Sequence, residues 1–94
     1  MPGNDQGYMG NELLTVSVMR PDSVMFDGKA LAVTVPAAGG PLQALPGHLP
    51  FASRTIAGEI MIKREDGGQA VFSAGSPGVF VFFRNKASLF IPAL

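Results

Sequence analysis

The stretch PAAGGPLQALPGHLP, residues 36–50, restricts the possible folds more than any other part of this chain. It contains four prolines and three glycines. Proline fixes φ and has no main-chain N–H to donate, so neither a helix nor a long central strand can run through the stretch. We therefore expect a long structured loop with a short strand inside it.

The remainder of the chain has the pattern of short strands separated by turns. Apolar side chains alternate with other side chains at a period of two, and no segment shows the period of 3.6 that marks a helix. Turn-forming residues recur at the spacing that is typical of all-β sandwiches and barrels. The sequence thus predicts an all-β fold, a small β-sandwich or flattened barrel of about 8–10 short strands.

Two local patterns are more specific. Glu65-Asp66-Gly67-Gly68 favours a two-residue hairpin of type I′, because Asp-Gly and Gly-Gly accept the positive φ angles of that turn. Residues 79–83 are apolar on both faces, which is typical of a central strand. The phenylalanines are expected to pack in the core, with an exposed aromatic platform as the weaker alternative; these are Phe72, Phe80, Phe82, Phe83 and Phe90.

Length and charge limit the classes of protein. The 94 residues suffice for one domain, which we place at residues 13–94 after a mobile leader at 1–12. The formal net charge is zero, which argues against nucleic acid as a partner and against a polybasic membrane anchor. No apolar run reaches the ~18 residues that span a bilayer. We expect a cytoplasmic protein without direct membrane insertion.

Catalytic and metal-binding patterns are weak. His48 is the single histidine and the chain has no cysteine. One histidine without cysteine is a poor set of ligands for a metal ion. No nucleophile motif stands near His48, so a loop histidine that packs or hydrogen-bonds is the favoured interpretation. Ser76 lies in AGSPG, where Pro77 forbids the helix that follows a nucleophile elbow. The sequence therefore predicts no enzyme, no cofactor and a protein-like binding partner.

The order of several motifs is more specific than any one of them. Phe26-Asp27-Gly28 follows the first strand, and Pro46-Gly47-His48-Leu49-Pro50 closes the glycine-rich loop. Gly58-Glu59-Ile60 opens another strand, and Asn85-Lys86 marks a late turn. In this order and spacing, residues 13–91 resemble the N-terminal domain of the epsilon subunit of F-type ATP synthases.

The resemblance implies a non-catalytic rotor subunit at the foot of the central stalk. It would clamp the gamma subunit to the ring of c subunits, as a peripheral protein on the cytoplasmic face of the inner or plasma membrane. The family's second, helical domain has no counterpart before Leu94, so coupling without inhibition by that domain is expected. The competing hypothesis is a free-standing β-sandwich that binds a ligand either in an aromatic groove formed by Phe80, Phe82 and Phe83 or at the Pro/Gly-rich loop.

The resemblance also suggests site residues. Pro46, Gly47 and Pro50 are expected to fix the loop backbone, while His48 orients the loop by hydrogen bonding. Their neighbours in the same loop are expected to meet the polar loops of the c ring; these are Gly40, Pro41, Leu42 and Gln43. The family often has an acid in front of Pro-Gly-His, and its replacement around Gly40-Pro41 predicts contacts that are less ionic.

Overall fold

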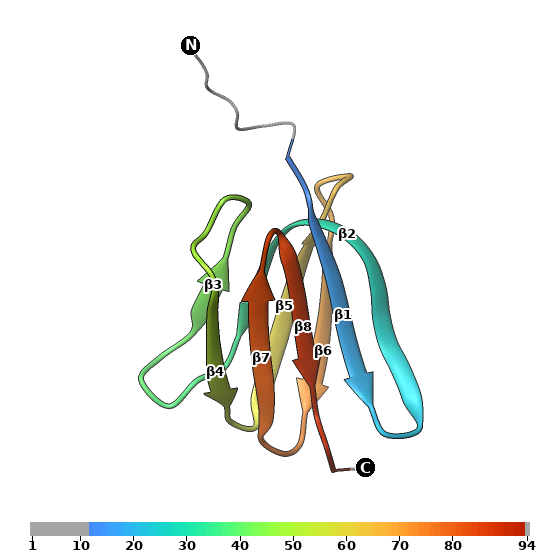
Figure 1. The fold of residues 1–94 in the computed structure, drawn as a ribbon. Coiled ribbons are helices and arrows are strands. Elements are labelled where there is room, and N and C mark those ends of the chain that lie inside the picture. The colour runs from blue at the N-terminus through green and yellow to red at the C-terminus, as the bar shows by residue number, and fades with distance from the viewer. Residues whose placement is uncertain (1–11, 94) are drawn as a thin grey trace.

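The computed structural model describes residues 12–93 (Figure 1). Apart from Glu12, the predicted leader lies outside the described residues. These residues form eight strands and no helix; the strands are β1 (Leu14–Arg20), β2 (Ser23–Val35), β3 (Leu42–Ala44), β4 (Phe51–Thr55), β5 (Gly58–Arg64), β6 (Gln69–Ala74), β7 (Gly78–Phe83) and β8 (Lys86–Phe90). The prediction of a small all-β fold is confirmed.

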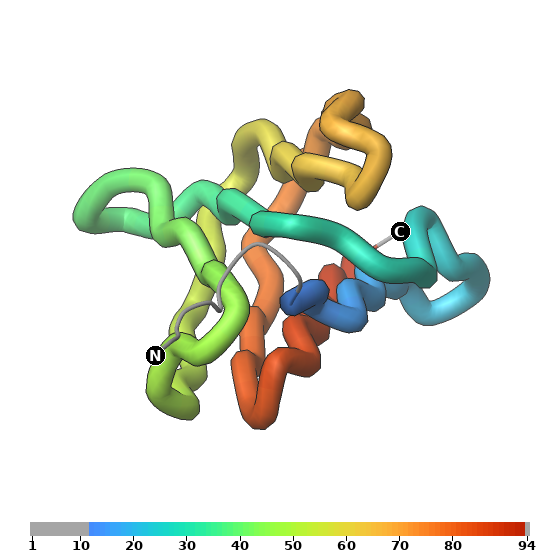
Figure 2. The backbone as a smooth tube through the Cα atoms, turned by 90° about the horizontal axis from the view of Figure 1, so that it is seen from above, coloured from blue at the N-terminus to red at the C-terminus, as the bar shows by residue number. Residues whose placement is uncertain are grey.

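One long strand serves both layers of the molecule. The first half of β2 pairs with β1, and its second half pairs with β5 and β3. A register shift between Ala30 and Ala32 marks the irregularity between the two halves, and such bulges bend a strand. The resulting order is β4-β7-β8-β1-β2-β5-β6, with β3 beside β2. Figure 2 shows β2 passing from the side of β1 to the side of β3.

The core is built from alternate residues of facing strands. On β1 the side chains of Leu14, Val16 and Val18 are buried, and on β7 those of Phe80 and Phe82 are buried. The period of two places every second side chain on the inner face. The apolar contact between the layers is what holds them together, since apolar area removed from water stabilises by about 25 cal/mol per Å².

The expectation that all five phenylalanines pack in the core is wrong for two of them. Phe83 is 53% exposed and Phe90 is 42% exposed. β7 is an interior strand between β4 and β8, as predicted. Its outer face, however, is not covered by any other part of residues 12–93, so the side chains that alternate with Phe80 and Phe82 point to solvent.

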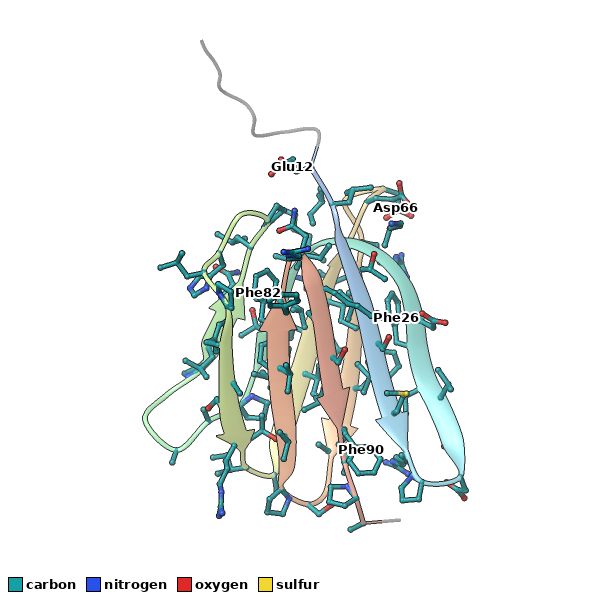
Figure 3. All side chains as sticks on the ribbon, in the orientation of Figure 1. Glu12, Phe26, Asp66, Phe82 and Phe90 are labelled. Atoms are coloured by element: carbon teal, nitrogen blue, oxygen red, sulfur yellow. The ribbon has the colours of Figure 1, made fainter. Side chains whose placement is uncertain are left out.

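The β5–β6 hairpin also differs from its prediction. Arg64 and Gly68 face each other through the hydrogen bond from Arg64 N–H to the Gly68 carbonyl, which leaves a three-residue loop. Only Gly67 in this loop has a positive φ, of 90°. This is a turn closed by a glycine bulge, a common alternative to the predicted type I′ turn. Asp66, labelled in Figure 3, occupies its tip.

We expect Asp66 to titrate below an ordinary aspartate. The Gly68 N–H donates to its Oδ1 over 2.8 Å, and Arg64 Nε lies 3.6 Å from the same oxygen. The backbone hydrogen bond and then the Arg64 charge lower the pKa of Asp66 from 3.8. The associated stability is therefore present above about pH 4 and is lost as the pH falls through the folded-state pKa.

An NMR titration of the Asp66 carboxyl carbon measures this pKa. In Arg64→Gln it should rise only part of the way toward 3.8, because the hydrogen bond from Gly68, the larger cause, remains. A complete return to the ordinary value in Arg64→Gln would show that the charge, and not the backbone, controls this carboxyl group.

Candidate functional site

The predicted site residues do not lie in one loop. Residues 36–41 enter β3 from one end of the sandwich, whereas residues 45–50 leave β3 at the other end (Figure 1). The three residues of β3 separate the two loops. His48 therefore cannot orient Gly40 and Pro41 directly, and the two sets of residues form two separate surfaces.

The loop before β3 is a compact, uncharged turn. The Gly40 N–H donates to the Ala37 carbonyl over 3.0 Å, and Gly40 has a φ of 120° that favours glycine. Pro41 is exposed, and Gly40 is half-buried. Leu42 and Gln43 already belong to β3, where Leu42 packs against the core and Gln43 is exposed. Of the four predicted contact residues, Leu42 is thus the one whose side chain holds the segment on the core.

The loop after β3 begins with a tight turn at Pro46-Gly47. The His48 N–H donates to the Leu45 carbonyl over 3.2 Å, and Gly47 has a φ of 87°. A proline followed by a residue of positive φ, closed by this hydrogen bond, is a type II turn. Pro46 and Gly47 are thus the two central residues of this turn, and their role in fixing the loop backbone stays a prediction. No contact of Pro50 bears on its predicted role.

His48 interacts mainly through its ring. The ring meets Phe51 edge-on at 4.9 Å between centroids and Phe82 at 5.8 Å. Its Nδ1–H donates to the carbonyl of the next residue, Leu49, over 2.8 Å. This hydrogen bond stays inside the loop. The ring contacts, in contrast, connect the loop to β4 and to the core residue Phe82, which Figure 3 shows beside this end of the sheet.

Asn85 is the polar residue that ties the loop to the sheet, and the sequence alone did not indicate this role. Its Oδ1 accepts the Gly47 N–H over 2.7 Å, and its carbonyl accepts the Thr15 N–H over 2.8 Å. Arg84 and Asn85 both have positive φ, 50° and 59°. They form the two-residue turn between the paired Phe83 and Lys86. The one feature of the sequence that pointed to Asn85 is that asparagine is common in two-residue hairpin turns.

An apolar surface covers the outer side of β7 and β8. Val79 pairs with Phe90 across the two strands, and Val81 and Phe83 follow on β7. All four side chains are exposed. The guanidinium of Arg84 lies 5.1 Å from the centre of the Phe83 ring, which is a cation–π distance. We call these four residues the β7–β8 face.

Within the described part of the chain, the geometry offers no catalytic pair. Ser76 lies in the β6–β7 turn, at the end of the sandwich opposite His48 (Figure 1). Residues 12–93 contain no group of three side chains suited to a metal ion. A hollow of about 90 Å³ lies on the layer formed by β2, β3, β5 and β6, and no aromatic side chain lines it; its lining residues are Ala32, Thr34, Gln43, Met61, Lys63 and Gln69. It does not match the aromatic groove of the competing hypothesis.

The family model that matches the chain decides its identity. It describes the β-sandwich domain of the ATP synthase delta/epsilon chain, and it matches residues 13–90. The chain belongs to this family. The resemblance seen in the motif order is confirmed. The delta/epsilon chain is a non-catalytic subunit, in agreement with the prediction that the chain is not itself an enzyme.

Individual relatives agree with the family. The ATP synthase epsilon chain of Bordetella petrii is 43% identical over 63 residues, which are 66% of this chain and 45% of the relative. That of Latilactobacillus sakei is 38% identical over 55 residues, 58% of this chain and 38% of the relative. The delta/epsilon-type chain described here thus spans less than half the length of these curated relatives.

Solved structures share the fold at low identity. A chain of the Euglena gracilis mitochondrial ATP synthase, solved as OSCP/F1/c-ring, matches 97% of this chain and 59% of its own length, with a TM-score of 0.79 and 14% identity. A chain of the Tetrahymena thermophila central stalk and c-ring matches 85% of this chain and 63% of its own length, with a TM-score of 0.70 and 10% identity. Within residues 12–93 no helix could cross a membrane.

Proposed function

We propose that this domain works in the central stalk of an F-type ATP synthase, where it clamps the gamma subunit to the c ring. Rotation of the ring, driven by protons or sodium ions, would then turn gamma. The match of residues 13–90 to the delta/epsilon sandwich domain carries this proposal. The c ring, and not an inserted segment of this domain, would hold it at the cytoplasmic face of the membrane.

The mechanical task requires a body that transmits torque without deforming. All eight strands belong to one hydrogen-bonded sheet that folds into two layers; seven follow one continuous path, and β3 pairs with β2 beside it. β1 and β8, which are far apart in sequence, pair in parallel at the middle of this path. Close packing of the core makes such a domain resist compression. These features support a role as a rigid coupling piece.

The loop before β3 is our candidate for the c-ring contact. Gly40, Pro41 and Gln43 would meet the polar loops of the ring, and Leu42 would hold the loop on the core. Residues 36–43 carry no charged side chain. The contact would therefore depend on hydrogen bonds and van der Waals packing, and salt should weaken it little.

The β7–β8 face is our candidate for the gamma contact. It presents Val79, Val81, Phe83 and Phe90 on two paired strands. The outer side of β5 and β6 is more polar, because Glu59, Lys63 and Gln69 are exposed there. Fully buried centres of protein interfaces are enriched in apolar and aromatic residues and depleted in charge. The β7–β8 face fits that description better.

Co-expression with the gamma subunit of the same organism, followed by size-exclusion chromatography, tests the proposal. We expect a one-to-one complex. Val81→Asp should abolish co-elution, because it places an unpaired charge in the interface. Val71→Asp is the matched control: Val71 is similarly exposed, on β6 in the other layer of the sandwich, and its variant should still co-elute.

The outcomes separate the function from the choice of face. If the folded parent domain elutes apart from gamma, the stalk role loses its main support and the ligand-binding alternative gains. If the parent co-elutes and Val71→Asp is the variant that fails, the role stands and gamma binds the outer side of β5 and β6.

A further inference from the structure

We propose that Asn85 is a positioning residue, which sets the orientation of the Pro46–Pro50 loop for the gamma subunit. The inference rests on the proposed function, but its structural part can be tested without any partner. It replaces His48 as the main polar determinant of the loop. His48 donates its hydrogen bond to Leu49, inside the same loop, whereas Asn85 reaches across from a different strand pair.

The chemistry of the type II turn explains why the loop needs this residue. The turn uses the Leu45 carbonyl and the His48 N–H. The N–H of Gly47, in the middle of the turn, takes no part in this hydrogen bond and needs another acceptor. Asn85 Oδ1 accepts it over 2.7 Å. A hydrogen bond restricts the direction in which its donor points. The side-chain amide of Asn85 therefore fixes the orientation of the turn relative to the sheet.

The main chain of Asn85 adds a second connection. Its carbonyl accepts the Thr15 N–H at the start of β1. Asn85 therefore joins three segments that are distant in sequence: the start of β1, the β7–β8 turn and the loop after β3. All three lie at the same end of the sandwich (Figure 1). A change of its side chain breaks only the connection to the loop.

The loop that Asn85 holds has an unusual tip. Leu49 is 78% exposed, and Leu45 is exposed as well. Phe83 and Arg84, immediately before Asn85, continue the β7–β8 face to this end of the molecule. An apolar loop tip contributes to binding when it is held in place beforehand, because the entropy of ordering it is not lost on association. Asn85 would supply that preorganisation.

The backbone of Asn85 permits a clean substitution. At a φ of 59° glycine is accepted without strain, and Asn-Gly and Gly-Gly both suit such turns. Asn85→Gly thus removes the Oδ1 acceptor and keeps the turn. Asn85→Asp keeps an acceptor oxygen at the same position and tolerates the same φ. Asn85→Gly thus tests loss of the acceptor oxygen, and Asn85→Asp tests whether an equivalent oxygen restores its effect.

The experiment measures amide exchange of Gly47 by NMR and affinity for gamma in parallel, with the unfolding midpoint as a check on the fold. In Asn85→Gly we expect exchange of the Gly47 amide to become about tenfold faster and binding of gamma to weaken about tenfold. In Asn85→Asp both quantities should stay within about twofold of the parent values.

Each alternative outcome has a definite meaning. Unchanged Gly47 exchange in Asn85→Gly overturns the role of Asn85 in holding the loop. Faster exchange with unchanged affinity overturns the link between the loop and the partner. If the parent chain does not bind gamma at all, the proposed function fails, while the exchange measurement still decides whether Asn85 positions the loop.

Discussion

Phe82→Ala will lower the free energy of unfolding by about 3–5 kcal/mol. Phe82 is 1% exposed, and its ring stacks on Phe51 at 5.9 Å between centroids. It also forms a T-shaped contact with the ring of His48. Truncation removes apolar burial and leaves a cavity in the core beneath β7, and both effects destabilise. Since small domains have only about 5–15 kcal/mol of stability, the variant should be close to unfolding at room temperature.

Urea denaturation followed by circular dichroism measures this loss. Phe83→Ala is the matched control, because the same residue type is changed one position along the same strand, where the side chain is 53% exposed. We expect Phe83→Ala to lower the free energy of unfolding by less than about 1 kcal/mol, mainly through loss of the contact with Arg84. Equal losses in the two variants would mean that β7 does not present Phe82 to the core and Phe83 to solvent.

Gly78→Ala should destabilise by about 1–3 kcal/mol, although it adds a single methyl group. A Cβ at position 78 would lie 2.5 Å from the carbonyl oxygen of Phe90 and 3.2 Å from Oγ1 of Thr55. The first of these atoms belongs to the backbone of β8 and cannot rotate away. β7 and β8 would have to separate locally, which weakens the pairing that connects β4 to the rest of the sheet.

The control for this substitution lies in the turn just before it. Gly75 has no atom within 4 Å of an added Cβ, and its φ lies outside the region that favours glycine. Gly75→Ala should therefore be neutral or slightly stabilising, because alanine restricts the unfolded chain. Thermal unfolding of both variants compares them directly. A Gly78→Ala variant as stable as Gly75→Ala would show that β8 accommodates the methyl group without cost.

Individual strands show how far local pattern can be trusted. The alternation from Leu14 to Val18 is enough to indicate β1, and these residues are indeed buried at every second position. Phe51–Thr55, which forms β4, has only a short pattern and follows a proline-rich loop, so the sequence gives little sign of a strand there. It is a strand because each of its residues pairs with one in β7. Context of this kind contributes as much to strand formation as intrinsic preference does.

The candidate site shows the same division. Pro46, Gly47 and His48 could be singled out from their order in the sequence. The separation of this loop from Gly40 and Pro41 could not, because it depends on how β3 runs between them. Asn85 lies 38 positions from Gly47 in the chain, and nothing local links the two.

The sequence by itself determined an all-β domain, the absence of a catalytic motif and the family of the chain. These follow from residue type, period and order, which are properties of the chain read from one end to the other. The tertiary structure decided that β1 and β8 pair in parallel and that Phe83 and Phe90 face outward. It also decided that Asn85 holds the Gly47 turn. Such features depend on which strands become neighbours, and hydrogen bonds between distant segments form only once the whole sheet is assembled.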